Sequence, residues 1–587
     1  MKIERLDDLP LLGAALKNLA TCEFLDKHFV AHGNWRGISL GQLCSVFLLY
    51  ILSESDHRLS HLQEWAKERE LGLRHILGCP NFTHLDCTDD RLAILLDYLS
   101  DDETYLKFEA EFNRHTLCVY SLLPVEEDLS ANVVHLDATI AQSFRAAKGL
   151  FAAGYSKHRR ADLPQIKIML STFSPFGIPL CVEVVKGSSA DDELYLPMIA
   201  RVEQTLMKQG LLFVGDSKLG SILNRYTVHL GKNYYLTPLN RVQLPFAELQ
   251  RLLVENKDKA SVLNEEDAVK ITAFEITQQR AQELTTWEER VIIAYSAPYN
   301  QTQTAKFDKQ LNKTEAALKE LAVSKQGKTQ LKTVEEVQNK VDEIFKENKT
   351  TEFFDLIITP QLTEKTTRKY KDIPARTTTT THFSLTITRK KDKIAEYKAV
   401  LGWRAYATNA PIDKLSTLKV LQTYKDEFKV EYRFNQLHNK TAPLMPIFLH
   451  KENRITALVR LLMLAIKVLG LLEYKIRKQI DLENIQINHI YPGNPARKTN
   501  KPTAEMVLRA FRNIFLAATP TDNNNFSLQV TQLLPHQQIL IRLAGFQNLI
   551  YNDISSQPNF NKNCISYNSE DAIKGKSFIT SRIDSSE

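Results

Sequence analysis

The chain has 587 residues, of which 43% are hydrophobic and 25% are charged, and its formal net charge at pH 7 is +6. This composition is that of ordinary soluble globular proteins, and it excludes a fibrous or wholly disordered chain. The length exceeds what one hydrophobic core accommodates, so we expect about three or four domains. The mild positive charge is compatible with a polyanionic partner without establishing one.

The cysteines and the apolar segments indicate the cellular compartment. Seven scattered cysteines, none in a CxxC pair, are typical of a reducing compartment and argue against a zinc site. Residues 1–10 are charged and lack the apolar core of a signal peptide. The most apolar segment, 455–472, is interrupted by Arg460 and Lys467, which favours a buried helix over a membrane span. We therefore expect a cytoplasmic protein with no membrane association.

Residues 1–130 are dense in helical patterning. Leu40, Leu43 and Phe47 recur at three- and four-residue steps, and Ser39 is the expected N-cap of that helix. This pattern predicts a helical N-terminal domain. A DNA-binding head and a packing or dimerisation domain both fit it, because spacing alone identifies no recognition helix.

The first strand predicted after this domain is 133–139, VVHLDAT, in which Asp137 stands near the exit. Runs at 166–173 and 178–185, separated by the turn residues SPFG, predict a hairpin, and 195–209 predicts a helix. Active sites on sheets are commonly built where strands end, which makes Asp137 the first catalytic candidate. The alternative is a turn or capping aspartate.

A second aspartate follows a second apolar strand. The run 211–215 predicts a buried strand that ends directly before Asp216. Two strands thus deliver an aspartate at the same kind of position, which is a stronger indication than either acid alone. Gly215 would allow a close approach by another backbone or by a substrate.

A basic loop lies between the predicted strands. The segment GYSKHRRADLPQ, 154–165, carries Lys157, His158, Arg159 and Arg160. Cations beside acids that hold metal ions suit a phosphodiester substrate, because they position backbone phosphates. The alternative is a solvated surface loop.

The composition changes from about residue 241. Residues 306–349 are rich in Lys, Glu and Gln, and 377–381 is a run of five threonines. Strand-like runs occur at 290–295 and 383–388. We interpret 241–395 as an insertion that is part helical and part strand.

A third acid follows the insertion. Residues 397–409 predict a strand and 415–439 predict one helix, on which one face begins apolar and turns polar; its members are Leu421, Tyr424, Phe428, Glu431, Asn435 and His438. An acid on an inward stripe is costly unless it is paired or bound to metal. Glu431 is therefore either an ion-paired glutamate or a metal ligand.

The C-terminal part divides into a helical region and a polar tail. Thr503 is the expected cap of a helix that runs through Phe511, and 555–587 is rich in Ser and Asn, which predicts disorder. The expected domains, in order, are a helical N-terminal domain, a core in two parts around the insertion, the helical C-terminal region and the tail: 1–130, 131–240, 241–395, 396–490, 491–554 and 555–587.

Taken together, these features resemble the DDE transposases of bacterial insertion sequences, in the branch whose RNase H-like core is interrupted between the second aspartate and the glutamate. The segments that carry the resemblance are SDHRLSHLQEW (55–65), HLDAT (135–139), GYSKHRRADLPQ (154–165), FVGDS (213–217), GWRAYATNAP (402–411) and PIFLHKENRI (446–455). The resemblance implies an α/β fold, with an RNase H-like mixed-sheet core, an α+β insertion and a helical N-terminal domain.

Members of this family often carry the pattern Y-x2-R-x3-E-x6-K around the third acid. Tyr424 and Glu431 match it, whereas Glu427 and His438 occupy the arginine and lysine positions. Both departures remove a cation expected near DNA, for which the candidate replacements are Lys429, Arg433 and Lys440.

The resemblance implies that Asp137, Asp216 and Glu431 hold two Mg²⁺ ions, for which Mn²⁺ can substitute. Such ions would activate the attacking water or 3′-hydroxyl and stabilise the leaving oxygen. The protein would cleave DNA at the terminal repeats of its element and join the freed 3′ end to target DNA, as a homodimer on DNA. The expected DNA contacts are Lys157, Arg159, Arg160, Tyr424, Arg433 and His438.

Trp287, in the insertion, supports two interpretations. Similar transposases use an insertion-domain aromatic to hold a flipped base, and unstacked bases do stack on aromatic rings. Core packing is the alternative, since large aromatics dominate cores.

Two other functions remain open. A catalytically inactive DNA-binding relic is suggested by Glu427, His438 and the polar tail, and an RNase H-like nuclease would cleave without joining. Metal-dependent joining distinguishes a transposase from the nuclease, and binding without cleavage would identify the relic.

Overall fold

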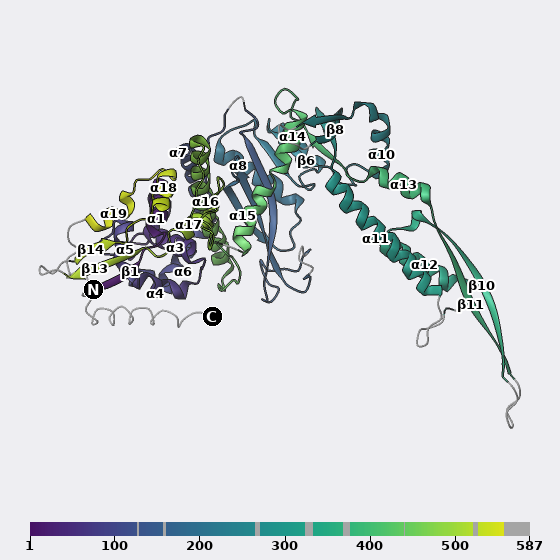
Figure 1. Cartoon of the computed structure of the whole chain (residues 1–587), viewed down its shortest axis with the longest axis horizontal. Helices are drawn as coiled ribbons and strands as arrows, with labels where there is room; N and C mark the ends of the chain where they lie inside the picture. Colours follow the sequence, from purple (N-terminus) through teal and green to yellow (C-terminus); the bar gives the residue numbers. More distant parts are fainter. Residues whose placement is uncertain are drawn as a thin grey trace. The chain divides into compact units, whose positions relative to one another are not determined.

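The computed structural model describes residues 1–125, 128–155, 160–264, 270–322, 331, 333–367, 376–439, 441–520 and 526–556. The fold is mixed α/β, as the sequence predicts, and it divides into two compact units (Figure 1). The first unit comprises Met1–Thr237 and Asn409–Glu587, and the second comprises Pro238–Thr408. The polar tail predicted at 555–587 lies outside the described residues from position 557 onward.

Helices dominate the N-terminal part of the first unit, in agreement with the helical pattern of its sequence. They are α1 (Leu9–Asn18), α2 (Thr21–His28), α3 (Leu40–Glu54), α4 (Leu59–Lys67), α5 (Glu70–Leu77), η1 (His84–Cys87), α6 (Asp89–Leu99) and α7 (Asp102–Val119). Ser39 caps α3 as predicted, because its side chain accepts a hydrogen bond from the backbone N–H of Gln42.

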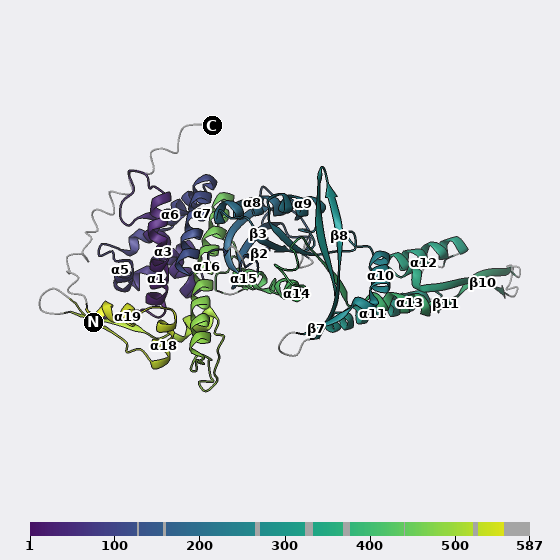
Figure 2. The ribbon, with the colours of Figure 1, turned by 90° about the horizontal axis from the view of Figure 1, so that it is seen from above.

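The first unit also contains five neighbouring strands of a mixed sheet, in the order β4-β3-β2-β5-β6. Its strands are β2 (Val133–Gln142), β3 (Gln165–Phe173), β4 (Ile178–Lys186), β5 (Leu212–Gly215) and β6 (Tyr234–Pro238). Strands β2, β3 and β4 are antiparallel neighbours, whereas β5 is parallel to both β2 and β6. The short helix η2 (Asp192–Leu194) leads into α8 (Tyr195–Leu206). Figure 2 shows α8 and α9 (Ile222–Leu230) on one face and α14 (Thr417–Lys425) and α15 (Phe428–Asn439) on the other. Covering both faces explains why the strands are almost continuously apolar.

The apolar helix α16 (Glu452–Glu483) packs against α3 and α6 on one side and against β4 on the other (Figure 2). It is the one helix in the described part of the chain that is long and apolar enough to span a membrane, and 94% of its most apolar 18-residue window is buried within the protein. The burial agrees with the predicted buried helix. The charged side chains inside it have polar partners, since Arg460 donates to the carbonyl of Leu99 at 2.9 Å and Lys467 to Asn113.

The C-terminal region is only partly helical, which corrects the prediction for 491–554. Strand β13 (Phe515–Pro520) lies between β1 (Lys2–Arg5) and β14 (Phe526–Val530) in a three-stranded sheet. The strand forms because its partner comes from the other end of the chain, a contact that local pattern does not encode. The helices here are α17 (Ala504–Ala510), capped by Thr503 as predicted but ending before Phe511, α18 (Pro535–Leu543) and α19 (Leu549–Ser556).

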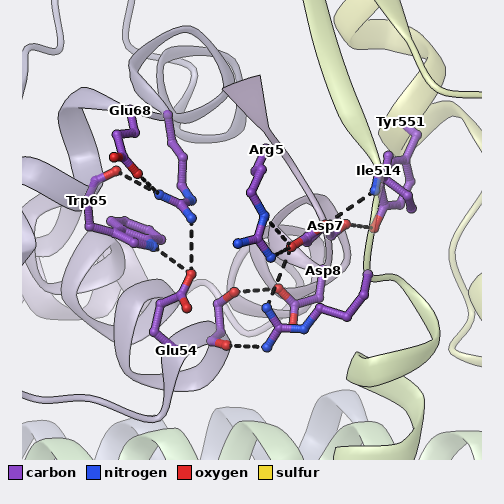
Figure 3. Close-up of polar contacts among 11 residues, drawn as sticks. Arg5, Asp7, Asp8, Glu54, Trp65, Glu68, Ile514 and Tyr551 are labelled. Atoms are coloured by element: carbon purple, nitrogen blue, oxygen red, sulfur yellow. Dashed lines mark hydrogen bonds and ion pairs between the residues drawn. The ribbon is translucent and has the colours of Figure 1, made fainter. Parts of the chain in front are cut away.

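A buried polar cluster connects the two ends of the first unit (Figure 3). The Asp7 carboxylate accepts hydrogen bonds from Arg5 Nε at 3.1 Å and from the backbone N–H of Ile514 at 3.2 Å. Tyr551 donates to the backbone carbonyl of Asp7 at 2.7 Å. The next residue, Asp8, is fully buried, and its Oδ1 accepts from Ser53 at 2.7 Å. Asp7 therefore joins the N-terminal segment to Ile514 and Tyr551, and Asp8 joins it to α3.

The second unit contains strands in the order β12-β9-β8-β7 and a separate β10-β11 hairpin. These are β7 (Ser261–Asn264), β8 (Lys270–Gln282), β9 (Thr285–Tyr295), β10 (Phe354–Thr367), β11 (Arg376–Arg389) and β12 (Trp403–Thr408). The helices are α10 (Phe246–Glu255), η3 (Lys257–Lys259), α11 (Ala297–Ala322), α12 (Val334–Asn348), η4 (Thr351–Phe353) and α13 (Lys391–Val400). The start of the strand predicted at 397–409 is thus the end of α13, and only Trp403–Thr408 is extended.

The single helix predicted at 415–439 is two helices, α14 and α15, separated at Asp426 and Glu427. Asp426 ends α14. The backbone N–H and the carbonyl of Asp426 take part in turn hydrogen bonds, so α14 and α15 are not one continuous helix. The apolar periodicity continues through the break, which is why the sequence pattern did not show it.

Candidate active site

Asp137 and Asp216 lie on two neighbouring interior strands of the sheet of the first unit. Parallel strands β2 and β5 pair in register from Val133 with Leu212 to Leu136 with Gly215; Asp137 is the next residue of β2, which continues to Gln142, and Asp216 directly follows the end of β5. Neighbouring strands are about 4.8 Å apart, and residues in register direct their side chains to the same face. Both aspartates are half-buried. The structure therefore brings together two carboxylates that are far apart in the sequence.

Three donors hold Asp216. Its Oδ1 accepts hydrogen bonds from the hydroxyl of Tyr195 and from the backbone N–H of Lys218, each at 2.8 Å, and Thr237 Oγ1 donates to its backbone carbonyl at 2.8 Å. Tyr195 comes from the first turn of α8 and Thr237 from β6. Tyr195 and Lys218 thus fix the carboxylate, and Thr237 fixes the backbone of the same residue.

The segment that carries the third acid runs along the Asp137 face of β2. His135 Nε2 lies 3.3 Å from the carbonyl oxygen of Thr423, and Thr139 Oγ1 lies 3.0 Å from His438 Nε2. Alternate residues of a strand share a face, so Asp137 points to the same side as His135 and Thr139. Asp137 therefore faces the middle of the segment between Thr423 and His438, which contains Glu427 and Glu431.

Glu431 does not lie on the buried side of α15, contrary to the inward stripe expected from its spacing. Its side chain is exposed, and the buried face is formed by Val430, Phe434 and Leu437. The helix break at Glu427 changes the phase of the stripe that begins on α14. Among the residues that the structure describes, no group of three or more His, Cys, Asp or Glu side chains is arranged to hold a metal ion.

The electrostatics at this edge are dominated by carboxylates around Tyr195. Burial raises the pKa of its phenol well above the usual value, and the charges of Asp216, Asp137 and Glu427 raise it further. Tyr195 was missed from the sequence, and Glu427 was noted only as a departure from a pattern. The one signal for Tyr195 is its place two residues after the acidic run DDE, at the start of a helix.

The residues predicted to contact DNA have different surroundings in the structure. Lys157 and Arg159 lie outside the described residues, and Arg160 is exposed and paired with Asp162, with Nε 2.8 Å from Oδ1. His438 contacts Thr139 as described above, and Tyr424 is half-buried on α14.

The structure corrects the prediction that Arg433 contacts DNA. Its side chain is 1% exposed, and it donates to the backbone carbonyls of Gly177 at 2.9 Å and Phe176 at 2.7 Å, in the turn between β3 and β4. Buried carbonyl oxygens require donors, and Arg433 supplies them. It fastens α15 to the sheet instead of facing a ligand.

Trp287 of the second unit is 3% exposed on β9, opposite Arg280 of β8. The burial agrees with the core-packing interpretation. A flipped base would reach this indole only if the surrounding side chains moved.

Two segments that carry the family resemblance meet at a cavity of about 880 Å³ in the first unit. Residues 54–69 form one wall, and the other wall comes from 443–448 and includes Phe448, which is 49% exposed. Its polar groups are engaged with one another: Trp65 Nε1 donates to Glu54 at 3.0 Å, and Arg58 pairs with Asp56 at 2.8 Å (Figure 3 shows the first of these).

Comparisons with known proteins add little to this geometry. No protein-family model and no curated protein sequence matches the chain. Among solved structures, a cryo-electron microscopy structure of a piggyBac transposase synaptic complex with hairpin DNA is similar over 49% of this chain at 9% sequence identity, with a TM-score of 0.24. The match spans 59% of the length of that chain. A likeness this loose carries no argument about function.

Proposed function

We propose that this protein is a metal-dependent DNA transposase of the DDE type, with an RNase H-like core interrupted by an insertion. The observation that carries the proposal is the register of β2 with β5, which places Asp137 and Asp216 on neighbouring strands directly after the last paired residues, Leu136 and Gly215. The proposal is supported by the packing of the segment that contains Glu431 along the same face of β2. It is also supported by the sequence segments that resemble this family and by their order along the chain.

The two aspartates suit a hard divalent cation. Mg²⁺ prefers oxygen ligands and is commonly bound by one or two protein carboxylates together with substrate phosphates. Asp137 and Asp216 would hold it, with Glu431 as the third carboxylate. When bound, Mg²⁺ or Mn²⁺ supplies Lewis-acid stabilisation of the phosphoryl oxygens and a more acidic water or 3′-hydroxyl.

The other residues at this edge would bind and orient the DNA. Arg160, exposed on the loop before β3, is available to exchange its surface partner Asp162 for a backbone phosphate. His438 replaces the family's lysine beside Thr139 and would contact DNA by hydrogen bonding. We further propose that the protein acts in the cytoplasm as a homodimer on the paired ends of its element.

The test is an excision and joining assay on a plasmid that carries the gene's own flanking DNA. Wild type is compared with Asp137→Asn, Asp216→Asn and Glu431→Gln, and with Glu103→Gln as a control for an exposed glutamate on α7, far along the chain from the three acids. We expect Mg²⁺-dependent release and reinsertion by wild type and by the control, and loss in the other three.

The alternatives give different results in the same assay. Cleavage without joining would identify a nuclease, and binding of the flanking DNA without cleavage by folded wild-type protein would identify a relic. Unchanged activity in Asp137→Asn or Asp216→Asn would contradict the assigned site.

A further inference from the structure

Tyr195 is the buried neighbour of the candidate metal site. It is the first residue of α8, its side chain is 2% exposed, and its hydroxyl donates to Asp216 Oδ1 at 2.8 Å. A tyrosine buried this deeply ordinarily places its hydroxyl on a hydrogen-bond partner, and here that partner is the half-buried carboxylate directly after the C-terminal end of β5.

The backbone of β5 is adapted to this contact. A Cβ at Gly215 would lie 2.9 Å from Tyr195 Cε1, which is closer than such atoms approach. Glycine at position 215 therefore lets the aromatic ring pass directly beside the strand and reach Asp216. The sequence predicts the close approach of a backbone or a substrate at this position, and the structure instead places the ring of Tyr195 there.

The two hydrogen bonds to the Asp216 carboxylate are asymmetric. Within the described part of the chain, Tyr195 and the N–H of Lys218 both donate to Oδ1. Two donors on one oxygen fix the rotation of the carboxylate group. Oδ2 is thereby turned away from Tyr195 and Lys218, and it is the oxygen left to a cation.

We propose that Tyr195 is a positioning residue that fixes the Asp216 carboxylate so that Oδ2 is presented to the divalent metal ion. The role rests on the proposed function, because it concerns the same site. The hydroxyl acts through Asp216 and does not itself touch the ion or the DNA. Partners that orient a metal ligand in this way typically change metal affinity or activity about 10- to 100-fold when removed.

The decisive variant is Tyr195→Phe in the full-length protein, which keeps the ring and removes only the hydroxyl. The control is Tyr105→Phe on α7, another tyrosine that is 2% exposed but lies outside this edge. Mn²⁺ binding to the protein is measured by isothermal titration calorimetry, and the Mg²⁺ concentration for half-maximal DNA cleavage is measured in parallel.

We expect Tyr195→Phe to weaken Mn²⁺ binding and to raise the Mg²⁺ requirement about 10- to 100-fold, with an unchanged KM for DNA and an unchanged melting temperature. Tyr105→Phe should match wild type in both measurements. Gly215→Ala, which keeps the hydroxyl but displaces the ring, should weaken Mn²⁺ binding in the same direction.

Two results overturn the role and separate it from the proposed function. If wild type binds Mn²⁺ and cleaves DNA while Tyr195→Phe does so equally well at every metal concentration, Tyr195 has no positioning role and the transposase proposal stands. If wild type neither binds Mn²⁺ nor cleaves, the proposed function fails, and the role of Tyr195 fails with it.

Discussion

Two pairs of aspartates in the same unit have opposite surroundings. Asp7 and Asp8 are adjacent in sequence and almost fully buried, at 3% and 0% exposed, whereas Asp137 and Asp216 are distant in sequence and half-buried. Partners from both ends of the chain surround the first pair (Figure 3). In the second pair, Tyr195 and Lys218 hold the Asp216 carboxylate, and both aspartates remain partly accessible.

The difference in burial separates a carboxylate that stabilises the fold from one that stays accessible to a ligand. Burial raises the pKa of Asp8 to about 6, because the charged form loses hydration and Ser53 compensates only in part. Asp216 stays partly accessible, while Tyr195 and Lys218 restrict its orientation. An aspartate whose every approach is filled stabilises the fold, whereas one that is partly accessible is suited to the ligand role that we propose.

The largest effect is expected on activity. Asp137→Asn and Asp216→Asn should each reduce DNA cleavage to background, because an amide binds Mg²⁺ far more weakly than a carboxylate does. The free energy of unfolding should change by less than about 1 kcal/mol, since neither residue is fully buried. Urea titration and the cleavage assay on the same preparations check both statements. If either variant lost stability together with activity, Asp137 and Asp216 would be needed for folding and not specifically for cleavage.

The reverse result is expected for Asp7→Ala. Removing this carboxylate leaves Arg5, Arg512 and the N–H of Ile514 without their acceptor, and we expect a loss of about 3–4 kcal/mol in the free energy of unfolding. Cleavage per folded molecule should not change. The m-value and midpoint of urea unfolding report the loss, and a stability equal to wild type would contradict the account of Figure 3.

Asp8 makes stability depend on pH in a direction that can be checked. Its pKa of about 6 in the folded state lies above the usual 3.8, so the folded protein binds the extra proton between these values. Stability should therefore fall as pH rises from about 4 through 6, by about 2–3 kcal/mol in total for this group.

Asp8→Asn removes the titrating group and should remove that part of the pH dependence. Chemical unfolding at pH 4.5, 6 and 8 measures it, with Asp101→Asn, an exposed N-cap of α7, as the control. Parallel stability curves for wild type and Asp8→Asn would show that Asp8 is ionised normally.

The smallest effect is expected for Arg160→Gln. Its pair with Asp162 is exposed, with side chains 50% and 62% accessible, so stability should not change measurably. If Arg160 contacts a phosphate, the slope of log Kd for DNA against log salt should decrease by about 1. Fluorescence anisotropy at several salt concentrations tests this, and an unchanged slope removes Arg160 from the DNA contacts.

The sequence could predict the aspartate pair because both signals are local. An apolar run followed by an acid identifies a strand, and parallel pairing then sets Asp137 beside Asp216; the acid marks the exit of β5 but not that of β2, which continues to Gln142. The N-cap residues Ser39 and Thr503 were predictable for the same reason, since capping depends on neighbours three residues away.

The misses depend on contacts between distant segments. Arg433 reads as a surface cation until the turn carbonyls of Phe176 and Gly177 are placed opposite it. Strand β13 forms only because β1 pairs with it, and the break at Glu427 is hidden by continuous apolar spacing. Tyr195 lacked any periodic or motif signal that would connect it with Asp216.

The most direct measurement is a crystal structure of the protein bound to one end of its element with Mn²⁺, in which anomalous scattering locates the ion. We predict a Mn²⁺ peak between Asp137 and Asp216, within about 2.5 Å of a carboxylate oxygen from each. Bound DNA with Mn²⁺ located elsewhere, and none at this edge, would contradict the assignment of the pair as the catalytic site.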